Sequence, residues 1–207
     1  MKKYEFTGET KQVGFFGNIT LKRIRATMEF GIIKIGDLGG WIEKEENLSH
    51  KGDAWVWGNA EVWGNAKVYG NAEVWGDAKV WGNAEVWGNA KVYGDAEVYG
   101  DAKVWGNAKV YGNAEVWGNA KVYGDAEVFS ISHVLVIGPV GSRNDFTTFF
   151  RDKDSEITVK CGCFLGKIDK FLEKVCETHG DSKYAIVYRT AVEIAKQQID
   201  LSEEKQA

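Results

Sequence analysis

At 207 residues the chain is long enough for one large domain or two small ones. Its 26 basic and 30 acidic residues are interspersed and give a formal net charge of -4, so no charged tract indicates DNA, RNA or anionic lipid as a partner. No apolar run approaches the ~18 residues of a membrane span, and MKKYEFTGETK lacks the apolar stretch of a signal peptide, so we expect a cytoplasmic protein with reduced cysteines.

The first fifty residues contain two strand-like segments, YEFTG and TLKRIRA, and then GDLGGWIEKEENLSH, which leads into a regular repeat. A stack of repeats exposes unpaired strand edges at its ends and therefore needs caps. We predict an N-terminal cap over residues 1–50.

A six-residue repeat dominates the middle of the chain. From Gly52, the unit Gly-Asn/Asp-Ala-x-Val-aromatic occurs thirteen times without insertion and ends at Phe129. A period of six excludes a helix, whereas Ala-x-Val-aromatic alternates as a strand does, and Gly followed by Asn or Asp favours the positive φ of a tight bend. Each unit is therefore one short strand and one bend, and the chain must stack its turns to pair such strands.

These units resemble the hexapeptide repeats of left-handed parallel β-helices, in which three hexads complete one triangular coil. The resemblance places Ala60 and Val62 inside and Asn65 at a bend, with an aromatic residue where enzymes of that class commonly have Gly. The spacing of six persists at Val128, Val134, Val140 and Phe146. We predict a mainly β fold in which a single-stranded left-handed β-helix of roughly five coils spans residues 51–145.

Alternation along the strands places Ala and Val in the core and puts charges and rings outside. With three hexads per coil, residues eighteen apart stack into columns: Trp57, Trp75, Tyr93, Tyr111 and Phe129; Trp63, Trp81, Tyr99 and Trp117; and Tyr69, Trp87, Trp105 and Tyr123. Stacked rings support a narrow core, and exposed ones can also form a binding or oligomer surface. The partner-binding candidates are Trp63, Trp81, Tyr99, Trp117, Trp87 and Trp105.

Alternating Glu and Lys form columns in the same way. Opposite charges such as Glu61 and Lys79 should be axial neighbours, worth tenths of a kcal/mol per pair. Lys109 breaks the alternation and predicts like-charge neighbours at Lys91/Lys109, Glu97/Glu115 and Lys103/Lys121.

The composition changes after Asp145, and we predict a C-terminal α+β module over residues 146–207. FTTFFR and EITVKCGCF alternate like paired strands around the turn DKDS. A first helix, which stops at Gly180, carries an apolar face formed by Ile168, Phe171, Leu172, Val175 and Cys176. A second helix is predicted from about Tyr184 to Ile199.

Both ends of the chain carry a family resemblance. GDLGGWIEKEENLS followed by GNAxVY units resembles hypothetical proteins of bacteriophages and prophages, and IGPVGSRNDFTTFF with KCGCFLG resembles a module that follows such β-helices in phage and bacterial proteins. The resemblance implies the cytoplasm of a bacterial host as the setting, and it implies no particular activity.

Histidines are the first candidates for chemistry, because hexapeptide acyltransferases typically use a loop histidine as base and bind the acyl donor between trimer subunits. His50, His133 and His179 all lie outside the perfect repeats, and no long loop interrupts the coils. A zinc carbonic anhydrase of this fold needs three convergent histidines. We expect His50 and His133 to be solvated or capping residues, and we predict no catalytic residue and no cofactor.

Two clusters near the C-terminus are candidate ligand sites. The turn residues Ser142, Arg143 and Asn144 can hold a phosphate or carboxylate, or can simply form a structural turn. Thr147, Thr148, Cys163 and His179 are their expected neighbours if the tail folds back onto this turn. Zinc ligands can be drawn from Cys161, Cys163, Cys176 and His179, or the thiols can pack as small apolar groups, which is the expectation we prefer.

The hypothesis we favour from the sequence is a non-enzymatic binding protein that presents aromatic faces or its C-terminal module to a partner. The phage resemblance adds a host target, either a defence protein that is inhibited or a nucleotide signal that is sequestered. Analogy with the fold adds a homotrimer. The alternatives are a diverged acyltransferase with a site between subunits and, third, a structural spacer of a virion.

Overall fold

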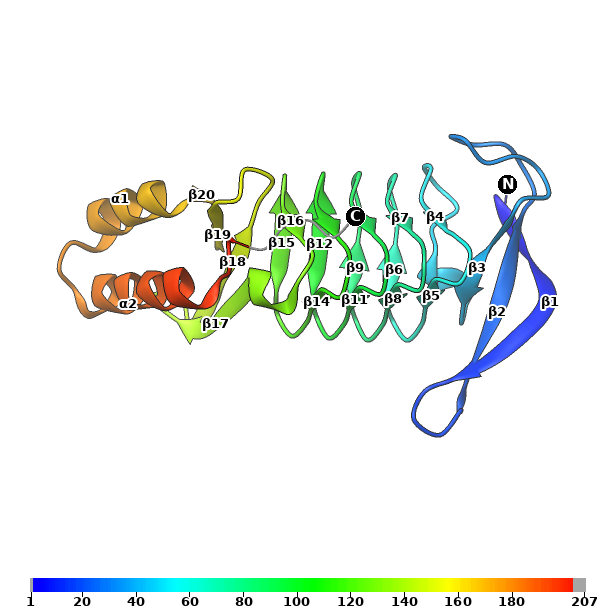
Figure 1. Cartoon of the computed structure of the whole chain (residues 1–207), viewed down its shortest axis with the longest axis horizontal. Coiled ribbons are helices and arrows are strands. Elements are labelled where there is room, and N and C mark those ends of the chain that lie inside the picture. Colours follow the sequence, from blue (N-terminus) through cyan, green and yellow to red (C-terminus); the bar gives the residue numbers. More distant parts are fainter. Residues whose placement is uncertain (1, 203–207) are drawn as a thin grey trace.

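The computed structural model describes residues 2–202 and shows an elongated molecule with three parts in chain order (Figure 1). A β-sheet cap comes first, a stack of short parallel strands forms the middle, and a sheet with two helices forms the C-terminal end. The predicted mainly β fold of stacked coils with an α+β module is confirmed. Among the described residues, no helix combines the length and apolarity that a membrane span requires.

Every third strand of the coils is a hydrogen-bonded neighbour, as in the sheet β16-β13-β10-β7-β4. The strands are β4 (Trp55–Val56), β5 (Glu61–Val62), β6 (Lys67–Val68), β7 (Glu73–Val74), β8 (Lys79–Val80), β9 (Glu85–Val86), β10 (Lys91–Val92), β11 (Glu97–Val98), β12 (Lys103–Gly106), β13 (Lys109–Val110), β14 (Glu115–Val116), β15 (Lys121–Gly124) and β16 (Glu127–Val128). Glu61 pairs in parallel register with Lys79, and its N–H donates to the carbonyl of Ala78 at 3.0 Å. Three hexads per coil are thereby confirmed.

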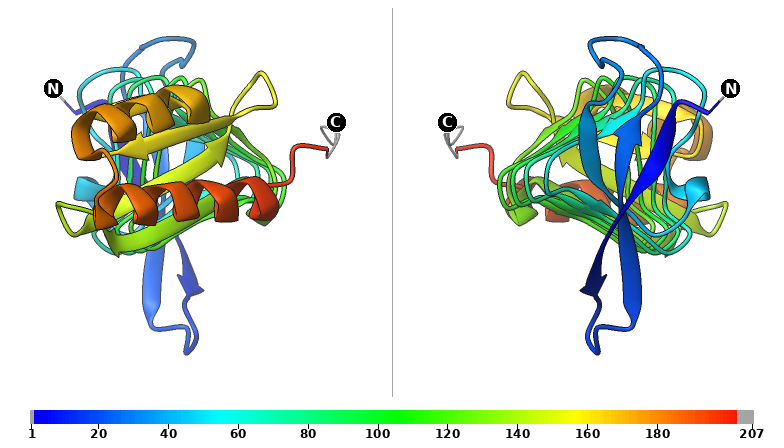
Figure 2. Two further views of the ribbon diagram at one scale, coloured as in Figure 1. Left: turned by 90° about the vertical axis from the view of Figure 1, so that its left-hand side faces the viewer. Right: turned by 90° about the vertical axis from the view of Figure 1, so that its right-hand side faces the viewer.

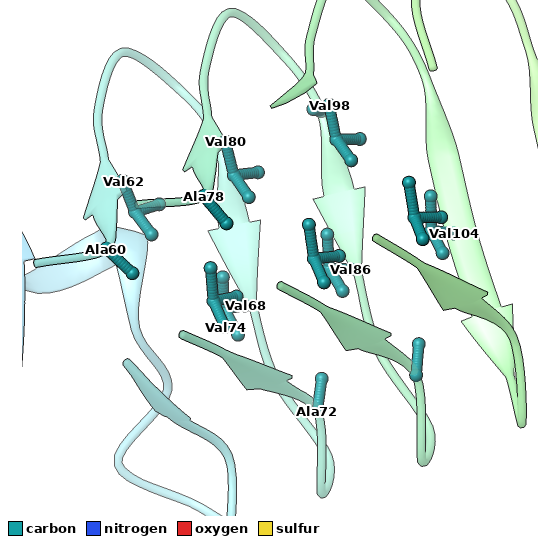
Figure 3. Packing of buried hydrophobic residues seen from close by; sticks show 14 of the residues in the cluster. Ala60, Val62, Val68, Ala72, Val74, Ala78, Val80, Val86, Val98 and Val104 are labelled. Atoms are coloured by element: carbon teal, nitrogen blue, oxygen red, sulfur yellow. The ribbon is translucent and has the colours of Figure 1, made fainter. Parts of the chain in front are cut away.

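The alanine and valine of every unit fill the interior. Ala60, Val62 and their counterparts in later coils have no exposed surface, and Figure 3 shows the valines of successive coils in rows. A buried Val contributes ~1.5–3 kcal/mol, whereas ordering the backbone costs ~1–2 kcal/mol per residue. One Val and one Ala per six residues are therefore a thin core, and the outer surface has to contribute as well.

Each corner pairs a glycine in the left-handed region with Asn or Asp. Gly82 has a φ of 72°, and a Cβ built on it would lie 3.0 Å from the backbone nitrogen of Gly100 in the next coil. The amides beside the glycines form ladders, and the Nδ2 of Asn65 donates to the Oδ1 of Asn83 at 3.1 Å. The corner therefore needs glycine both for its conformation and for the spacing of the coils.

The N-terminal cap extends one sheet of the coils. It contains β1 (Tyr4–Val13), β2 (Ile19–Ala26) and β3 (Leu38–Ile42), which gives the strand order β1-β2-β3-β5-β8-β11-β14 and confirms the two strands predicted from YEFTG and TLKRIRA. Two side chains satisfy carbonyls of the first coil. Lys3 Nζ donates to Ala54 at 2.6 Å, and Asn47 Nδ2 donates to Ala66 at 2.8 Å.

The hairpin formed by β1 and β2 projects well beyond the outline of the coils (Figure 2). Phe15 and Phe16 lie in the connection at its tip, with exposed fractions of 95% and 84%. The hairpin therefore carries an unshielded apolar tip.

The C-terminal sheet is antiparallel and consists of β17 (Val134–Val140), β18 (Asp145–Arg151), β19 (Ile157–Cys161) and β20 (Phe164–Lys167). The prediction that the coils continue through Val134, Val140 and Phe146 is wrong, because β17 pairs antiparallel with β18. The last Gly-Asp corner begins at Gly124. Without further corners of this kind the chain stays extended, and it reverses at a turn that begins with Gly141, whose φ is 73°.

Both predicted helices are present, as α1 (Ile168–His179) and α2 (Lys183–Gln198). Gly180, with a φ of 54°, ends α1 as expected, and its N–H donates to the carbonyl of Cys176. The helices cover the C-terminal sheet and share with it a second core that includes Phe149, Phe171 and Val192. FTTFFR and EITVKC are paired strands, also as predicted.

Candidate interaction surface and C-terminal pocket

The rings on the outside of the coils form three stacks, which begin at Trp63, Tyr69 and Trp75 and follow the predicted columns. Trp57, the predicted first ring of one column, packs against the core instead. Between most neighbours the ring centroids are 4.3–5.5 Å apart, and the planes are nearly parallel. The last pair of one stack, Tyr111 and Phe129, is tilted by 32°. Stacked pairs contribute ~0.5–1.5 kcal/mol beyond the area that they bury. The stacks therefore supply stabilisation that the narrow core lacks.

Trp117 departs from this pattern. Its centroid is 6.4 Å from that of Tyr99, and its side chain is 55% exposed, whereas every other ring of the three stacks is buried or half-buried. Beside it lies a groove of about 420 Å³ lined by Glu115, Trp117, Gly118, Asn119, Val134, Leu135, Val136 and Phe146. The indole thus stands at the rim of a mostly apolar groove where the last coils meet β17.

A hydrogen bond anchors the stack behind Trp117. The Tyr99 hydroxyl donates to Oε2 of Glu115 at 2.9 Å. Burial and this bond raise the pKa of Tyr99 to about 12, so the phenol remains a neutral donor at physiological pH. Glu115 is the carboxylate of the groove, and its position is fixed by the ring of the preceding coil.

The six candidate rings divide between two surfaces. Trp63, Trp81, Tyr99 and Trp117 follow the strands β5, β8, β11 and β14 of one sheet, and their stack ends at the groove. Trp87 and Trp105 belong to another stack, 4.8 Å apart, and both are half-buried. The sequence interpretation missed Val134, Val136 and Phe146 as groove residues. The absence of Gly-Asn or Gly-Asp corners after Gly124 was the signal that could have found them.

The predicted charge columns have the expected register. Glu61 faces Lys79, and like charges meet at Lys91/Lys109, Glu97/Glu115 and Lys103/Lys121. Opposite charges nearby relieve this repulsion. Lys103, for example, pairs with Glu85 at 3.1 Å, and Lys109 pairs with Glu127 at 3.0 Å.

A second concavity, of about 240 Å³, lies in the C-terminal module and is called the C-terminal pocket here. It brings together Ser142, Arg143, Cys161, Cys163, His179 and Tyr188. The expected neighbourhood of the turn with Cys163 and His179 is therefore confirmed. Asn144 lies in the turn itself, with a φ of 50°.

Two predicted neighbours of the turn face elsewhere. Thr147 and Thr148 are buried in β18. The Thr147 hydroxyl donates to Sγ of Cys161 at 3.3 Å, and Oγ1 of Thr148 accepts from the N–H of Lys121 at 3.0 Å. Both hydroxyl groups therefore form hydrogen bonds to neighbouring strands and are not directed at the turn.

Within the described part of the chain, the thiols are not grouped for metal binding. Cys163 and Cys176 are exposed and Cys161 is half-buried. Across residues 2–202, no group of three or more His, Cys, Asp or Glu side chains is placed to hold a metal ion. The set Cys161, Cys163, Cys176 and His179 therefore gains no support as a zinc site.

The three histidines lie in three different parts of the molecule. His50, in the cap, stacks on Tyr4 at 4.4 Å, and burial lowers its pKa. His133 follows the last coil and is fully buried, and its Nδ1 accepts from the N–H of Phe129. Of the two expected roles it therefore has that of a capping residue and not that of a solvated one. His179 ends α1 and stacks on Tyr188.

A comparison with models of known protein families finds no match for this chain, and a search of the curated proteins finds none either.

Proposed function

We propose that the chain is a non-enzymatic binding protein that holds a protein partner in the groove beside Trp117. The observation that carries the proposal is the exposed indole at the end of a ring stack, next to Val134, Val136 and Phe146. Concave apolar surface of this kind commonly marks an interaction site, and Trp is enriched among the residues that dominate binding energy.

The coils favour this use because they hold the groove in one shape. Trp81 and Tyr99 stack at 4.4 Å behind Trp117, and the Glu115 carboxylate is fixed by Tyr99. A surface that is ordered before binding loses little conformational entropy when a partner docks. Glu115 at the rim adds a polar contact that selects a donor on the partner.

The resemblance of both chain ends to phage and prophage proteins supports a protein of the bacterial host as the partner. Inhibition of a host defence protein is then the proposed consequence of binding. A second copy of the chain is the competing occupant, because the resemblance to hexapeptide β-helices implies a homotrimer.

The experiment is affinity capture from bacterial lysate with the tagged protein, its Trp117→Ser variant and an Ile186→Ser control. Ile186 is 58% exposed on α2, so the control loses an apolar side chain of similar exposure outside the groove. We expect one stoichiometric partner, identified by mass spectrometry, that Trp117→Ser loses and Ile186→Ser keeps. Equal capture by both variants contradicts the proposal. So does a homotrimer, measured by light scattering, that only Trp117→Ser dissociates.

A further inference from the structure

The C-terminal pocket has a composition of its own. Its lining supplies several hydrogen-bond donors, from Ser142, Arg143, Lys174, Thr178 and Tyr188, and among the described residues that line it none is acidic. We propose that the pocket binds a small phosphate monoester, with the phosphoryl group at Arg143 and an apolar body against the rings below it. This site does not depend on the groove beside Trp117.

Arg143 is the anchor of the proposed site. Its guanidinium lies against the turn between β19 and β20, where a Cβ on Gly162 would come within 2.8 Å of Nη1. No carboxylate among the described residues pairs with Arg143, whereas most basic side chains of the coils have a partner of this kind. A planar guanidinium without an internal partner is suited to two parallel hydrogen bonds with a phosphate.

The remaining donors surround the same space. Lys174 lines the pocket from α1 and pairs with Glu177 at 2.9 Å. The Tyr188 hydroxyl reaches the turn so closely that a Cβ on Gly141 would lie 1.9 Å from it. Burial and the neighbouring Cys161 raise the pKa of Tyr188, which keeps the phenol protonated as a donor at neutral pH. A ligand with several acceptor oxygens matches this set better than a single carbonyl does.

The apolar part of the lining indicates which group the phosphate should be attached to. Phe164, Phe171 and Val175 line the pocket, and Tyr188 forms an edge contact with Phe171 and stacks on His179. At about 240 Å³ the pocket is smaller than the ~300–1,000 Å³ of drug-sized sites. A phosphate carried on one small ring therefore fits this chemistry better than a dinucleotide or a chain.

The test is titration calorimetry of the full chain with phenyl phosphate and, separately, with inorganic phosphate. We expect saturable binding of phenyl phosphate, and weaker binding of inorganic phosphate because it leaves the apolar floor uncovered. Arg143→Gln should weaken binding by about tenfold or more, as expected for loss of charge-assisted hydrogen bonds. Lys174→Gln should also weaken it. Lys170→Gln is the matched control, because Lys170 lies one turn earlier on α1 and has the same pairing with a glutamate three residues on.

Two cysteines give an independent readout without mutation. Cys163 and Cys176 are both exposed, but of the two only Cys163 lines the pocket. Bound phenyl phosphate should slow alkylation of Cys163 several-fold and leave the rate at Cys176 unchanged. The proposal is overturned if phenyl phosphate does not bind, if Arg143→Gln binds it as well as the unmodified chain does, or if both cysteines are protected equally. Equal affinity for inorganic phosphate overturns the assignment of a monoester.

Discussion

Glycine at the corners of the coils meets two separate requirements, which single substitutions can separate. Gly82 and Gly118 both have positive φ, 72° and 62°. A Cβ on Gly82 would be 3.0 Å from the next coil, whereas a Cβ on Gly118 would meet nothing within 4 Å. The first position needs glycine for conformation and spacing, and the second needs it for conformation alone.

We therefore expect Gly118→Ala to lower the free energy of unfolding by about 1–2 kcal/mol, the cost of a left-handed L-residue. Gly82→Ala should cost about 1–3 kcal/mol more, because the backbone of the neighbouring coil has to move. Urea denaturation monitored by tryptophan fluorescence measures both values. Equal losses would show that the close approach of the coils contributes no constraint of its own.

Between elements, Asp152 joins the last coil to the C-terminal sheet. Ala126 of the coil bridges to Asp152, whose carboxylate is buried. Its Oδ2 accepts from Lys167 Nζ and from the Thr158 hydroxyl, both at 2.5 Å. Burial alone would raise the pKa of Asp152, but these bonds and the backbone N–H of Asp154 outweigh burial and hold the pKa below its usual value.

A carboxyl whose pKa is lowered on folding stabilises the folded state fully at pH values above its pKa in the unfolded chain, about 3.9. This contribution is lost as the pH falls through the pKa in the folded state. We expect Asp152→Asn to lower the free energy of unfolding by about 1–3 kcal/mol at neutral pH and by less in acid. Asp154→Asn is the control, because the exposed Asp154 lies 4.0 Å from the same Lys167. Its effect should stay below about 0.5 kcal/mol. Denaturation curves at neutral and acidic pH measure both effects. If the two variants lost similar amounts of unfolding free energy, the stabilisation would not belong to Asp152 in particular.

The elements differ in how far the sequence predicts them. The coils follow from a local pattern, since each unit contains its own strand and corner, and the register follows from repetition. Phe146 shows the limit of that reasoning: its spacing of six fits the repeat, yet strand pairing with β17 places it in the groove beside Trp117. The turn around Arg143 was predictable from its own residues. Its neighbours on α1 and α2 were not, because they depend on how the helices dock.

In the whole molecule, the coils determine how far apart the N-terminal cap and the C-terminal module lie and how the two are rotated relative to each other. One hexad is one side of the triangular coil, so its removal would turn the hairpin of Phe15 and Phe16 relative to the groove by one side. Removal of three hexads would shorten the molecule by one coil and keep the relative orientation of the two ends. Deletions of three hexads can therefore probe the charge columns while the geometry of both ends is preserved.

Two such deletions have opposite effects on the charges. Removing residues 89–106 places Lys109 after Glu85, restores strict alternation and eliminates all three like-charge contacts. Removing residues 71–88 keeps those contacts and adds new ones, with Glu61 below Glu97 and Lys67 below Lys103. We expect both proteins to fold, and the first to have the higher free energy of unfolding, by about 1–2 kcal/mol when tenths of a kcal/mol per pair are summed.

The salt dependence of the difference identifies its cause. The two deletions remove different rings, so ring stacking can offset the stabilities by an amount that is independent of the charges. Charge repulsion between half-exposed side chains weakens as the Debye length shrinks from ~10 Å at 0.1 M salt to ~3 Å at 1 M. The advantage of the deletion of residues 89–106, measured by thermal unfolding, should therefore narrow as salt is added. If the difference in stability between the two deletion proteins stayed constant from low to high salt, it would come from ring stacking. The charge columns would then contribute nothing measurable to stability.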